Sequence, residues 1–211
     1  MPAPDRALAF AVTALVVIVI PGPSVLFVVG RTLAGGRRVA LLSVLGNSAG
    51  EYVQVVAVAF GIGALAEHSV AAFTALRLAG GAYLVYLGAR TFMRRRTLAA
   101  LSTSASAPAD SRSFAQGLTV GVTNPKTVVF LTAILPQFVN RATGHVAGQV
   151  LVLGLVFAAI ALASDTAWVL AAARFRGWFA RSPRRLELVG GTGGLAIAAV
   201  GVGFLVTGRS D

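Results

Sequence analysis

The stretch FAQGLTVGVTNPKTVVFLTAIL, from Phe114 to Leu135, combines two features that are seldom found in one segment. It has the length and apolar content of a membrane span, since about 20 residues cross a hydrocarbon core of about 30 Å. It is nevertheless interrupted by Asn124, Pro125 and Lys126. Proline breaks a helix, and a charge in hydrocarbon is usually functional or paired because its burial is costly. The segment therefore predicts a broken membrane helix with a buried cation.

Five further segments also have the length and composition of membrane spans. Hydrophobic residues make up 56% of the 211 residues and charged residues 12%, whereas a soluble domain carries about 25% charged residues. The sequence therefore predicts an all-α integral membrane protein with six transmembrane helices. The expected spans are Ala7–Gly30, Val39–Leu65, Leu76–Phe92, Phe114–Leu135, Ala147–Ala173 and Leu188–Thr207, with Val70 as an alternative start of the third.

The basic residues are unevenly distributed between the two sides of this arrangement. Thirteen of the 18 lie in or beside the first, third and fifth loops, and loops rich in Lys and Arg face the cytoplasm. Both termini are then expected outside. Because the arginines lie between apolar spans, we expect them to contact anionic membrane lipids and not nucleic acid. The thirteen basic residues of the first, third and fifth loops are Arg31, Arg37, Arg38, Arg90, Arg94, Arg95, Arg96, Arg112, Arg174, Arg176, Arg181, Arg184 and Arg185.

A small, polar segment, TLAALSTSASAPADSRS at 97–113, is typical of a flexible linker, here a cytoplasmic one. It separates a first half, 1–96, from a second half, 114–211, each with three spans. An odd number of spans gives the halves opposite orientations, so they would form two inverted three-helix repeats with a broken first helix in each. The stretches PGPSVLFVV from Pro21 and NPKTVVFLT from Asn124 support this prediction, because both place a proline before a similar apolar run.

The break at Pro21, Gly22 and Pro23 has two interpretations. The prolines remove backbone donors and disfavour helix just upstream, so carbonyl oxygens without helical partners become available to a ligand. The alternative is a kink with a purely structural role, which is common in membrane helices. The matching break at Pro125 favours a site.

Lys126 is expected near the middle of the membrane, about 18 Å along the span from Phe114. At this depth its ammonium group needs an acidic partner, a set of carbonyl oxygens or an anionic ligand. Asn124 can both donate and accept hydrogen bonds at the broken turn. We predict a functional role for Lys126, and a structural ion pair with Glu51 or Asp165 is the alternative.

Glu51 lies in the second span of the first half. It shares a helix face with Asn47, four residues earlier, and Gly46 and Gly50 on the adjacent strip allow another helix to approach closely. Because desolvation favours the neutral form of a carboxyl group, Glu51 is a candidate proton carrier. The alternative is a carboxylate neutralised by Lys126.

Asp165 lies in the second span of the second half, about two and a half turns before Arg174. It is therefore expected either to reach a cavity on the cytoplasmic side or to pair with an arginine of the inner leaflet.

The sequence offers no set of residues typical of an enzyme or a metalloprotein. It has no cysteine, its two histidines are not spaced as metal ligands, and no nucleophile accompanies a base within a span. We therefore expect no catalytic residue, no metal site and no cofactor.

Three motifs resemble those of the lysine exporter (LysE) superfamily, in particular its homoserine/threonine-efflux branch. They are PGP at Pro21–Pro23, GNSAGE ending at Glu51, and NPKTVVFLTAILPQF from Asn124 to Phe138. The resemblance covers nearly the whole chain. It implies an inner-membrane exporter of amino acids or their derivatives, of homoserine, threonine or lysine type, driven by the proton gradient. Members often carry an aspartate in the second span, and the longer acid Glu51 is expected to affect substrate choice more than mechanism.

The expected function is secondary transport with alternating access. A zwitterionic amino acid needs a cation for its carboxylate, which Lys126 and backbone amides at the breaks would supply, and an anion for its ammonium group. Glu51 or Asp165 would supply the anion, and the other would exchange protons. A metal or inorganic-ion exporter on the same scaffold and a non-catalytic membrane scaffold are the alternatives. Glycine-rich faces at Gly80–Gly81 and Gly190–Gly194 would permit a homodimer.

Overall fold

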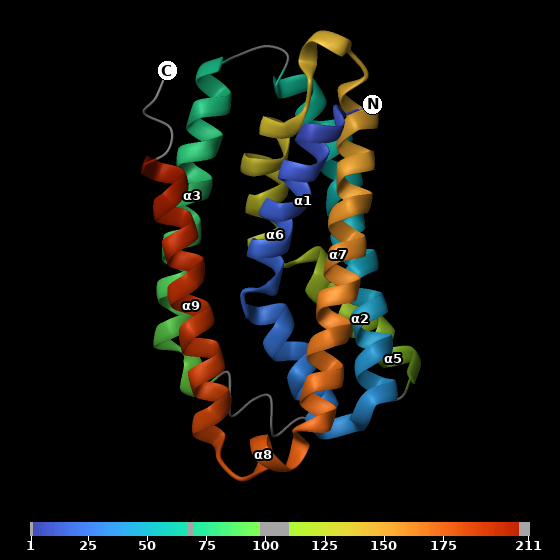
Figure 1. Ribbon diagram of the computed structural model, residues 1–211, viewed down its shortest axis with the longest axis vertical. Helices are drawn as coiled ribbons and strands as arrows, with labels where there is room; N and C mark the ends of the chain where they lie inside the picture. The colour runs from blue at the N-terminus through green and yellow to red at the C-terminus, as the bar shows by residue number, and fades with distance from the viewer. Residues whose placement is uncertain (1, 67–69, 98–109, 207–211) are drawn as a thin grey trace.

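A computed structural model describes residues 2–66, 70–97 and 110–206, and all the regular secondary structure in these ranges is helical (Figure 1). The predicted linker lies mostly outside the described residues. The elements are α1 (Pro4–Val19), α2 (Pro23–Ala66), α3 (Val70–Met93), α5 (Asp110–Val122), α6 (Pro125–Val129), a π-helix η1 (Phe130–Ile134), the 3-10 helices η2 (Leu135–Phe138) and η3 (Arg141–Thr143), α7 (Val146–Arg174), α8 (Arg176–Ala180) and α9 (Pro183–Val206).

Both predicted helix breaks are confirmed. Helix α1 ends at Val19 and α2 begins at Pro23, with a bend of 54° between them. Helix α5 ends at Val122 and α6 begins at Pro125, with a bend of 40°. Proline has no backbone N–H and its fixed φ suits the first position of a helix. Each proline motif therefore ends one helix and starts the next.

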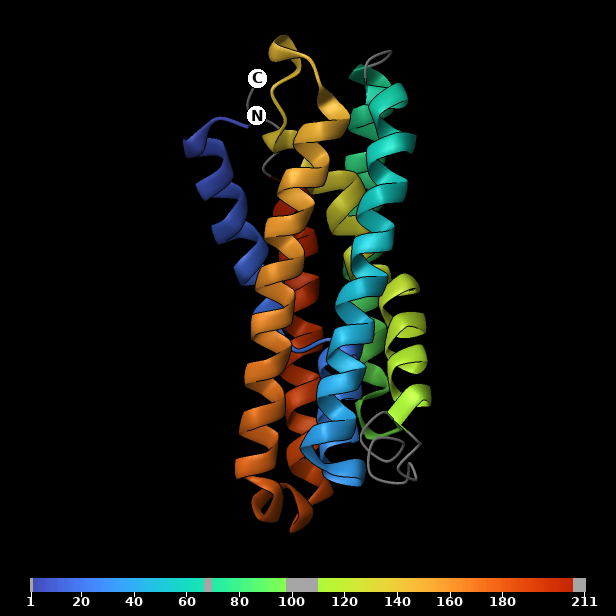
Figure 2. The ribbon, with the colours of Figure 1, turned by 90° about the vertical axis from the view of Figure 1, so that its right-hand side faces the viewer.

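Helix α2 contains the turn between the first two predicted spans. Gly36 has a φ of +79°, which is outside the helical region, and glycine adopts such a conformation without steric cost. The chain reverses direction there, at the lower end of the molecule in Figure 1. The portion of α2 after Gly36 then packs between α5 and α7 (Figure 2).

The helices are apolar enough for a membrane protein. Within the described residues, helix α7 and residues Arg184–Gly203 of α9 can each cross a membrane by length and hydropathy, and the two bent pairs would raise the number of such spans to four. Large apolar side chains such as Leu8, Phe60 and Leu155 are more than half exposed, as expected for surfaces that face lipid. The arrangement of six spans in two inverted repeats stays a prediction.

The starts of α3 and α9 lie furthest from the starts of the predicted spans. Helix α3 begins at Val70, the alternative start, and α9 begins at Pro183 rather than near Leu188. The earlier start of α9 reflects Pro183, whose geometry suits a first helical turn, and the arginines that follow it are tolerated at a helix end near the membrane surface.

Glycines let two helix pairs pack backbone to backbone. A Cβ atom on Gly46 or Gly50 would overlap the backbone of α5, and one on Gly117 or Gly121 would overlap the backbone of α2. This confirms the predicted close-approach surface beside Glu51 and identifies α5 as its partner.

Helices α3 and α9 form the second pair. Gly80 lies against Ala133 and Gly81 against Leu205. In α9, Gly190 and Gly191 lie against Arg95, Gly193 against Pro21 and Gly194 against Gly88. These faces are therefore occupied within the chain, which corrects the expectation that they are free to form a homodimer.

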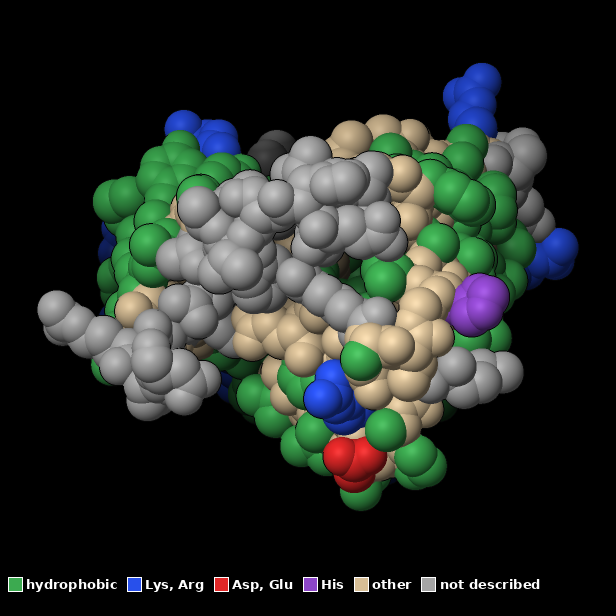
Figure 3. All heavy atoms as spheres, turned by 90° about the horizontal axis from the view of Figure 1, so that it is seen from above, with side chains coloured by type: hydrophobic (Ala, Val, Ile, Leu, Met, Phe, Trp, Pro, Cys, Tyr) green, Lys and Arg blue, Asp and Glu red, His purple; other side chains and the backbone are tan. Residues whose placement is uncertain are grey.

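The connections rich in arginine gather at one end of the bundle. The Gly36 turn, the end of α3 and α8 lie at the lower end in Figure 1, whereas α1 and α7 begin at the opposite end. Figure 3 views that opposite end, where the coloured atoms are mainly apolar side chains in green and backbone or other uncharged groups in tan, with Lys and Arg side chains in blue at a few places. This spatial separation agrees with the predicted grouping of the loops, and their placement in the cytoplasm stays a prediction.

Candidate functional site

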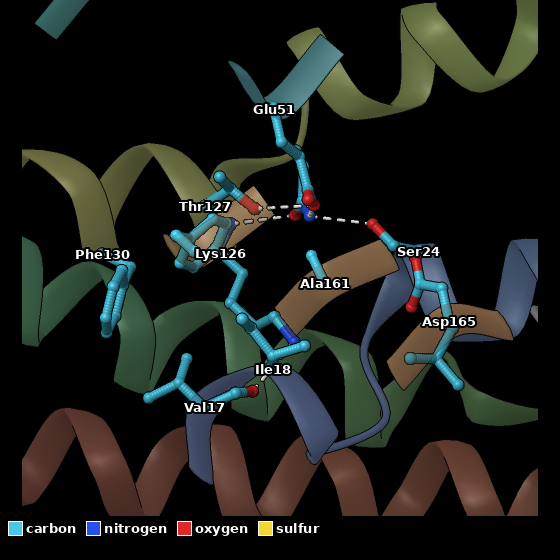
Figure 4. A pocket seen from close by; sticks show the side chains of 12 residues that line it. Val17, Ile18, Ser24, Glu51, Lys126, Thr127, Phe130, Ala161 and Asp165 are labelled. Carbon is cyan, nitrogen blue, oxygen red and sulfur yellow. Dashed lines mark hydrogen bonds between the residues drawn. The ribbon is translucent and has the colours of Figure 1, made fainter. Parts of the chain in front are cut away.

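The three charged residues predicted to lie within the membrane meet at the two helix breaks. Glu51 of α2, Lys126 of α6 and Asp165 of α7 are 4%, 6% and 3% exposed. All three line one cavity, which is drawn in Figure 4. The cavity has a volume of about 10 Å³, enough for about one water molecule. Its walls are Val17, Ile18, Ser24, Val25, Glu51, Asn124, Lys126, Thr127, Phe130, Phe157, Ala161 and Asp165.

The two carboxylate oxygens of Glu51 differ in the hydrogen bonds that they accept from the described residues. Its Oε1 accepts hydrogen bonds from Thr127 Oγ1 at 3.1 Å, Asn124 Nδ2 at 3.3 Å and Asn47 Nδ2 at 3.4 Å. Its Oε2 is buried and accepts no hydrogen bond from any residue that the structure describes. Buried polar atoms are nearly always paired, so Oε2 is the acceptor of this carboxylate that remains available.

Asp165 is joined to Glu51 through an amide. Asn47 Nδ2 donates to Asp165 Oδ2 at 3.0 Å as well as to Glu51, so Asn47 bridges the two acids without lining the cavity itself. Within the described part of the chain, no arginine lies within ion-pairing distance of Asp165. Of the two interpretations of Asp165, the structure therefore favours the cavity.

The Lys126 ammonium is held by backbone carbonyl oxygens. Nζ donates to the carbonyl oxygens of Val17 and Ile20, both at 3.1 Å. The helical partner of the Val17 carbonyl would be the N–H of residue 21, which is a proline and has none. Neither Glu51 nor Asp165 is within 4.0 Å of Nζ, so of the partners considered for Lys126 the structure has the carbonyl oxygens and not the alternative, a direct ion pair. The break at Pro21, Gly22 and Pro23 thus creates the acceptors that bind Lys126.

The second break is arranged in the same way. The carbonyl of Gly121 lacks its i+4 helical donor because the residue four positions later is Pro125, and its backbone donor is instead Asn124 N at 3.3 Å. Gln54 Nε2 donates to this carbonyl at 2.7 Å and to that of Val122 at 2.8 Å. Each half of the chain therefore supplies the side chain that caps the broken helix of the other half, a lysine in one case and a glutamine in the other.

Asn124, one of the predicted site residues, caps α6 by accepting from Lys126 N at 3.2 Å, and its Nδ2 donates to Ser24 Oγ at 2.8 Å.

Several other residues of the site were not predicted from the sequence. Ser24, Thr127 and Gln54 are common polar residues of membrane helices, and their spacing carries no signal. The position of Gln54 becomes informative only once α2 is known to pack against α5.

Replacing Gln54 with leucine is expected to destabilise the α5 break. The change leaves the carbonyls of Gly121 and Val122 without their side-chain donor, at a cost of about 1–3 kcal/mol. Thermal unfolding of the purified protein in detergent would show a lower midpoint. Gln137→Leu is the matched control, because exposed Gln137 donates to the carbonyl of Ala133, four residues earlier, and does not cap either proline break. Equal effects of the two substitutions would contradict the capping role of Gln54.

Comparison with known proteins places the chain in one family. The model of the "LysE type translocator" family matches residues 15–208. A homoserine/homoserine lactone efflux protein of Salmonella typhimurium is 30% identical over 193 residues, 92% of each chain. A leucine efflux protein of Klebsiella pneumoniae is 31% identical over 150 residues, 70% of this chain and 71% of that protein.

An uncharacterized membrane protein of Vibrio cholerae is 34% identical over 176 residues, 83% of this chain and 84% of that protein. No solved structure matches the chain. With a family match that covers both helix breaks and all three buried charges, the chain belongs to the LysE family of translocators.

Proposed function

We propose that this translocator exports amino acids or their derivatives from the cytoplasm, as a secondary transporter with alternating access that exchanges its cargo for protons. The observation that carries the proposal is the cavity where Glu51, Asp165 and Lys126 meet at two broken helices. Secondary transporters bind substrate and coupling ions at such discontinuous helices. Family membership supports transport and gives no reason to expect an enzyme.

The names of the relatives suggest the chemistry of the cargo. Homoserine, homoserine lactone and leucine appear in those names, and all three compounds carry a primary amine. In our proposal one of Glu51 and Asp165 binds this amine and the other exchanges protons. Lys126, with backbone amides at the breaks, binds the carboxylate of those cargoes that have one, after it leaves the carbonyls of Val17 and Ile20.

We further propose that the two halves, 1–96 and 114–211, form inverted three-helix repeats joined by the linker 97–113. The reciprocal capping by Lys126 and Gln54 supports a common origin of the halves. In this arrangement six spans cross the inner membrane, both termini lie outside, and the arginine-rich loops contact anionic lipids in the cytoplasmic leaflet. A homodimer would use surfaces other than the glycine faces of α3 and α9.

The cavity must open for an amino acid to enter. Its volume of about 10 Å³ leaves no room for one, so the structure corresponds to a closed conformation. The two proline breaks and the π-helix η1 adjoin the cavity. Such interruptions of regular helix are common at functional sites and provide places where helices bend. We propose these segments as the hinges of alternating access.

The test is efflux from cells preloaded with a panel of labelled amino acids, with and without an uncoupler. We expect cells with the protein to lose at least one amino acid faster than cells without it, and the uncoupler to abolish the difference. Equal efflux for every amino acid would contradict the proposal. The same assay with metal ions would then test the ion-exporter alternative.

A further inference from the structure

We infer that Oε2 of Glu51 is the anchor for a primary ammonium group, and that this group, rather than a carboxylate, is the obligatory part of the cargo. The inference rests on the proposed function and deepens it, because it chooses between the two acids and defines a substrate class. That class is primary amines, including amino acids whose carboxylate is esterified or closed into a lactone.

The hydrogen bonds around Glu51 provide the first argument. The donors that reach its carboxylate, from Thr127, Asn124 and Asn47, all bind Oε1. Glu51 lines the cavity and its Oε2 has no partner. In Figure 4 the Glu51 carboxylate extends from α2 into the space between Thr127 and Ser24. A group that only donates hydrogen bonds, as an ammonium does, fits this oxygen.

The charges of the cavity provide the second argument. Among the described residues, its lining contains two acids, Glu51 and Asp165, one cation, Lys126, and no other ionisable side chain. When all three are ionised the site is one positive charge short. A buried charge without compensation is costly, so the site gains from a proton or from a cationic group. A ligand that carries only a carboxylate would add to the excess of negative charge.

The state of Lys126 provides the third argument. Its ammonium is already bound by the carbonyls of Val17 and Ile20. A carboxylate must compete with these carbonyls for Lys126, whereas an ammonium finds Oε2 free. The space available also matches, because the cavity holds about one water molecule and an ammonium group has a similar size. The ammonium subsite is therefore formed in the closed conformation and the carboxylate subsite is not.

Binding to the purified full chain in detergent tests the inference independently of transport. The probes are leucine, leucine methyl ester, which lacks the free carboxylate, and 2-hydroxy-4-methylpentanoate, which has a hydroxyl in place of the amine. Binding raises the midpoint of thermal unfolding with ligand concentration, which gives an apparent Kd. We expect the ester to bind within about tenfold of leucine and the hydroxy acid at least about tenfold more weakly, since a charge-assisted hydrogen bond is lost.

Substitutions of Glu51 locate the effect. Glu51→Gln keeps an oxygen for Thr127 and Asn124 but removes the charge, and it is expected to weaken leucine and its ester at least about tenfold. Glu51→Asp, which restores the carboxylate, should recover part of the affinity. Glu187→Gln is the matched control, because Glu187 pairs with Arg96 at 3.6 Å outside the cavity. The Glu187→Gln variant should bind both probes as the unmodified protein does.

Two results would overturn the inference: a hydroxy acid that binds as well as the ester, or an ester that fails to bind or is unaffected by Glu51→Gln. The proposed function fails separately. If the ester binds through Glu51 but no amino acid leaves preloaded cells, the subsite stands and amino-acid export does not. If amino acids are exported while the hydroxy acid competes equally, export stands and the ammonium anchor does not.

Discussion

Cells that carry Lys126→Ala are expected to export no faster than cells without the protein. The substitution removes the one cation among the described residues that line the cavity, and it leaves the carbonyls of Val17 and Ile20 without their donor. Two buried acids then remain without a positive charge in the cavity, and an uncompensated buried charge is costly. Efflux of the labelled cargo identified in wild-type cells measures the loss.

The same variant should still fold and insert into the membrane. The close packing of α2 on α5 and of α3 on α9 depends on glycines and not on Lys126. The amount of protein in the membrane fraction and its elution in gel filtration check this point. Lys126→Met, which keeps the aliphatic stem, separates loss of charge from loss of volume, and Arg94→Met serves as a control at an exposed cation. Normal export by either Lys126 variant would remove this residue from the mechanism.

Gly121→Ala is expected to have the largest effect on stability. Its new Cβ atom would overlap the carbonyl of Asn47 across the α2–α5 contact. Neither helix backbone can yield without moving Asn47, whose amide bridges Glu51 and Asp165. Overpacking of this kind costs about 3 kcal/mol or more, so we expect a lower thermal midpoint and less protein in the membrane.

Gly148→Ala is the matched control for this substitution. Gly148 lies in α7, and a Cβ atom there would meet nothing within 4 Å. Because alanine favours a helix over glycine by about 1 kcal/mol, this variant should be as stable as the unmodified protein or slightly more so. Similar losses in the two variants would contradict the role of the α2–α5 contact.

Local features of the fold could be predicted from the sequence because their causes are local. The prolines at 21, 23 and 125 end and start helices wherever they are placed. Gly46 and Gly50, four residues apart, must form a smooth strip on a helix. Glu51, Asp165 and Lys126 line one cavity, and their proximity has a general cause, because buried charges in a membrane protein need one another or a ligand.

Features that depend on which helices are neighbours could not be predicted. Lys126 was expected to pair with an acid or with carbonyls, and the choice of Val17 and Ile20 follows from the position of α6 against α1. The role of Gln54 likewise follows from the contact between α2 and α5. The packing of the glycine faces on α3 and α9 within the chain was not predicted for the same reason, because a strip of glycines does not indicate which segment packs against it.

In the proposed exchange for protons, the charge of the cargo bound at Glu51 also determines how the membrane potential acts on transport. Export of a zwitterion in exchange for a proton moves one elementary charge inward, whereas export of a monocation in exchange for a proton moves none. A potential of 100 mV contributes about 2.3 kcal/mol for each charge moved. A site that accepts both amino acids and their esters at Glu51 would therefore be electrogenic for the first and electroneutral for the second. Cells would concentrate the two kinds of cargo outside to different extents at the same pH difference.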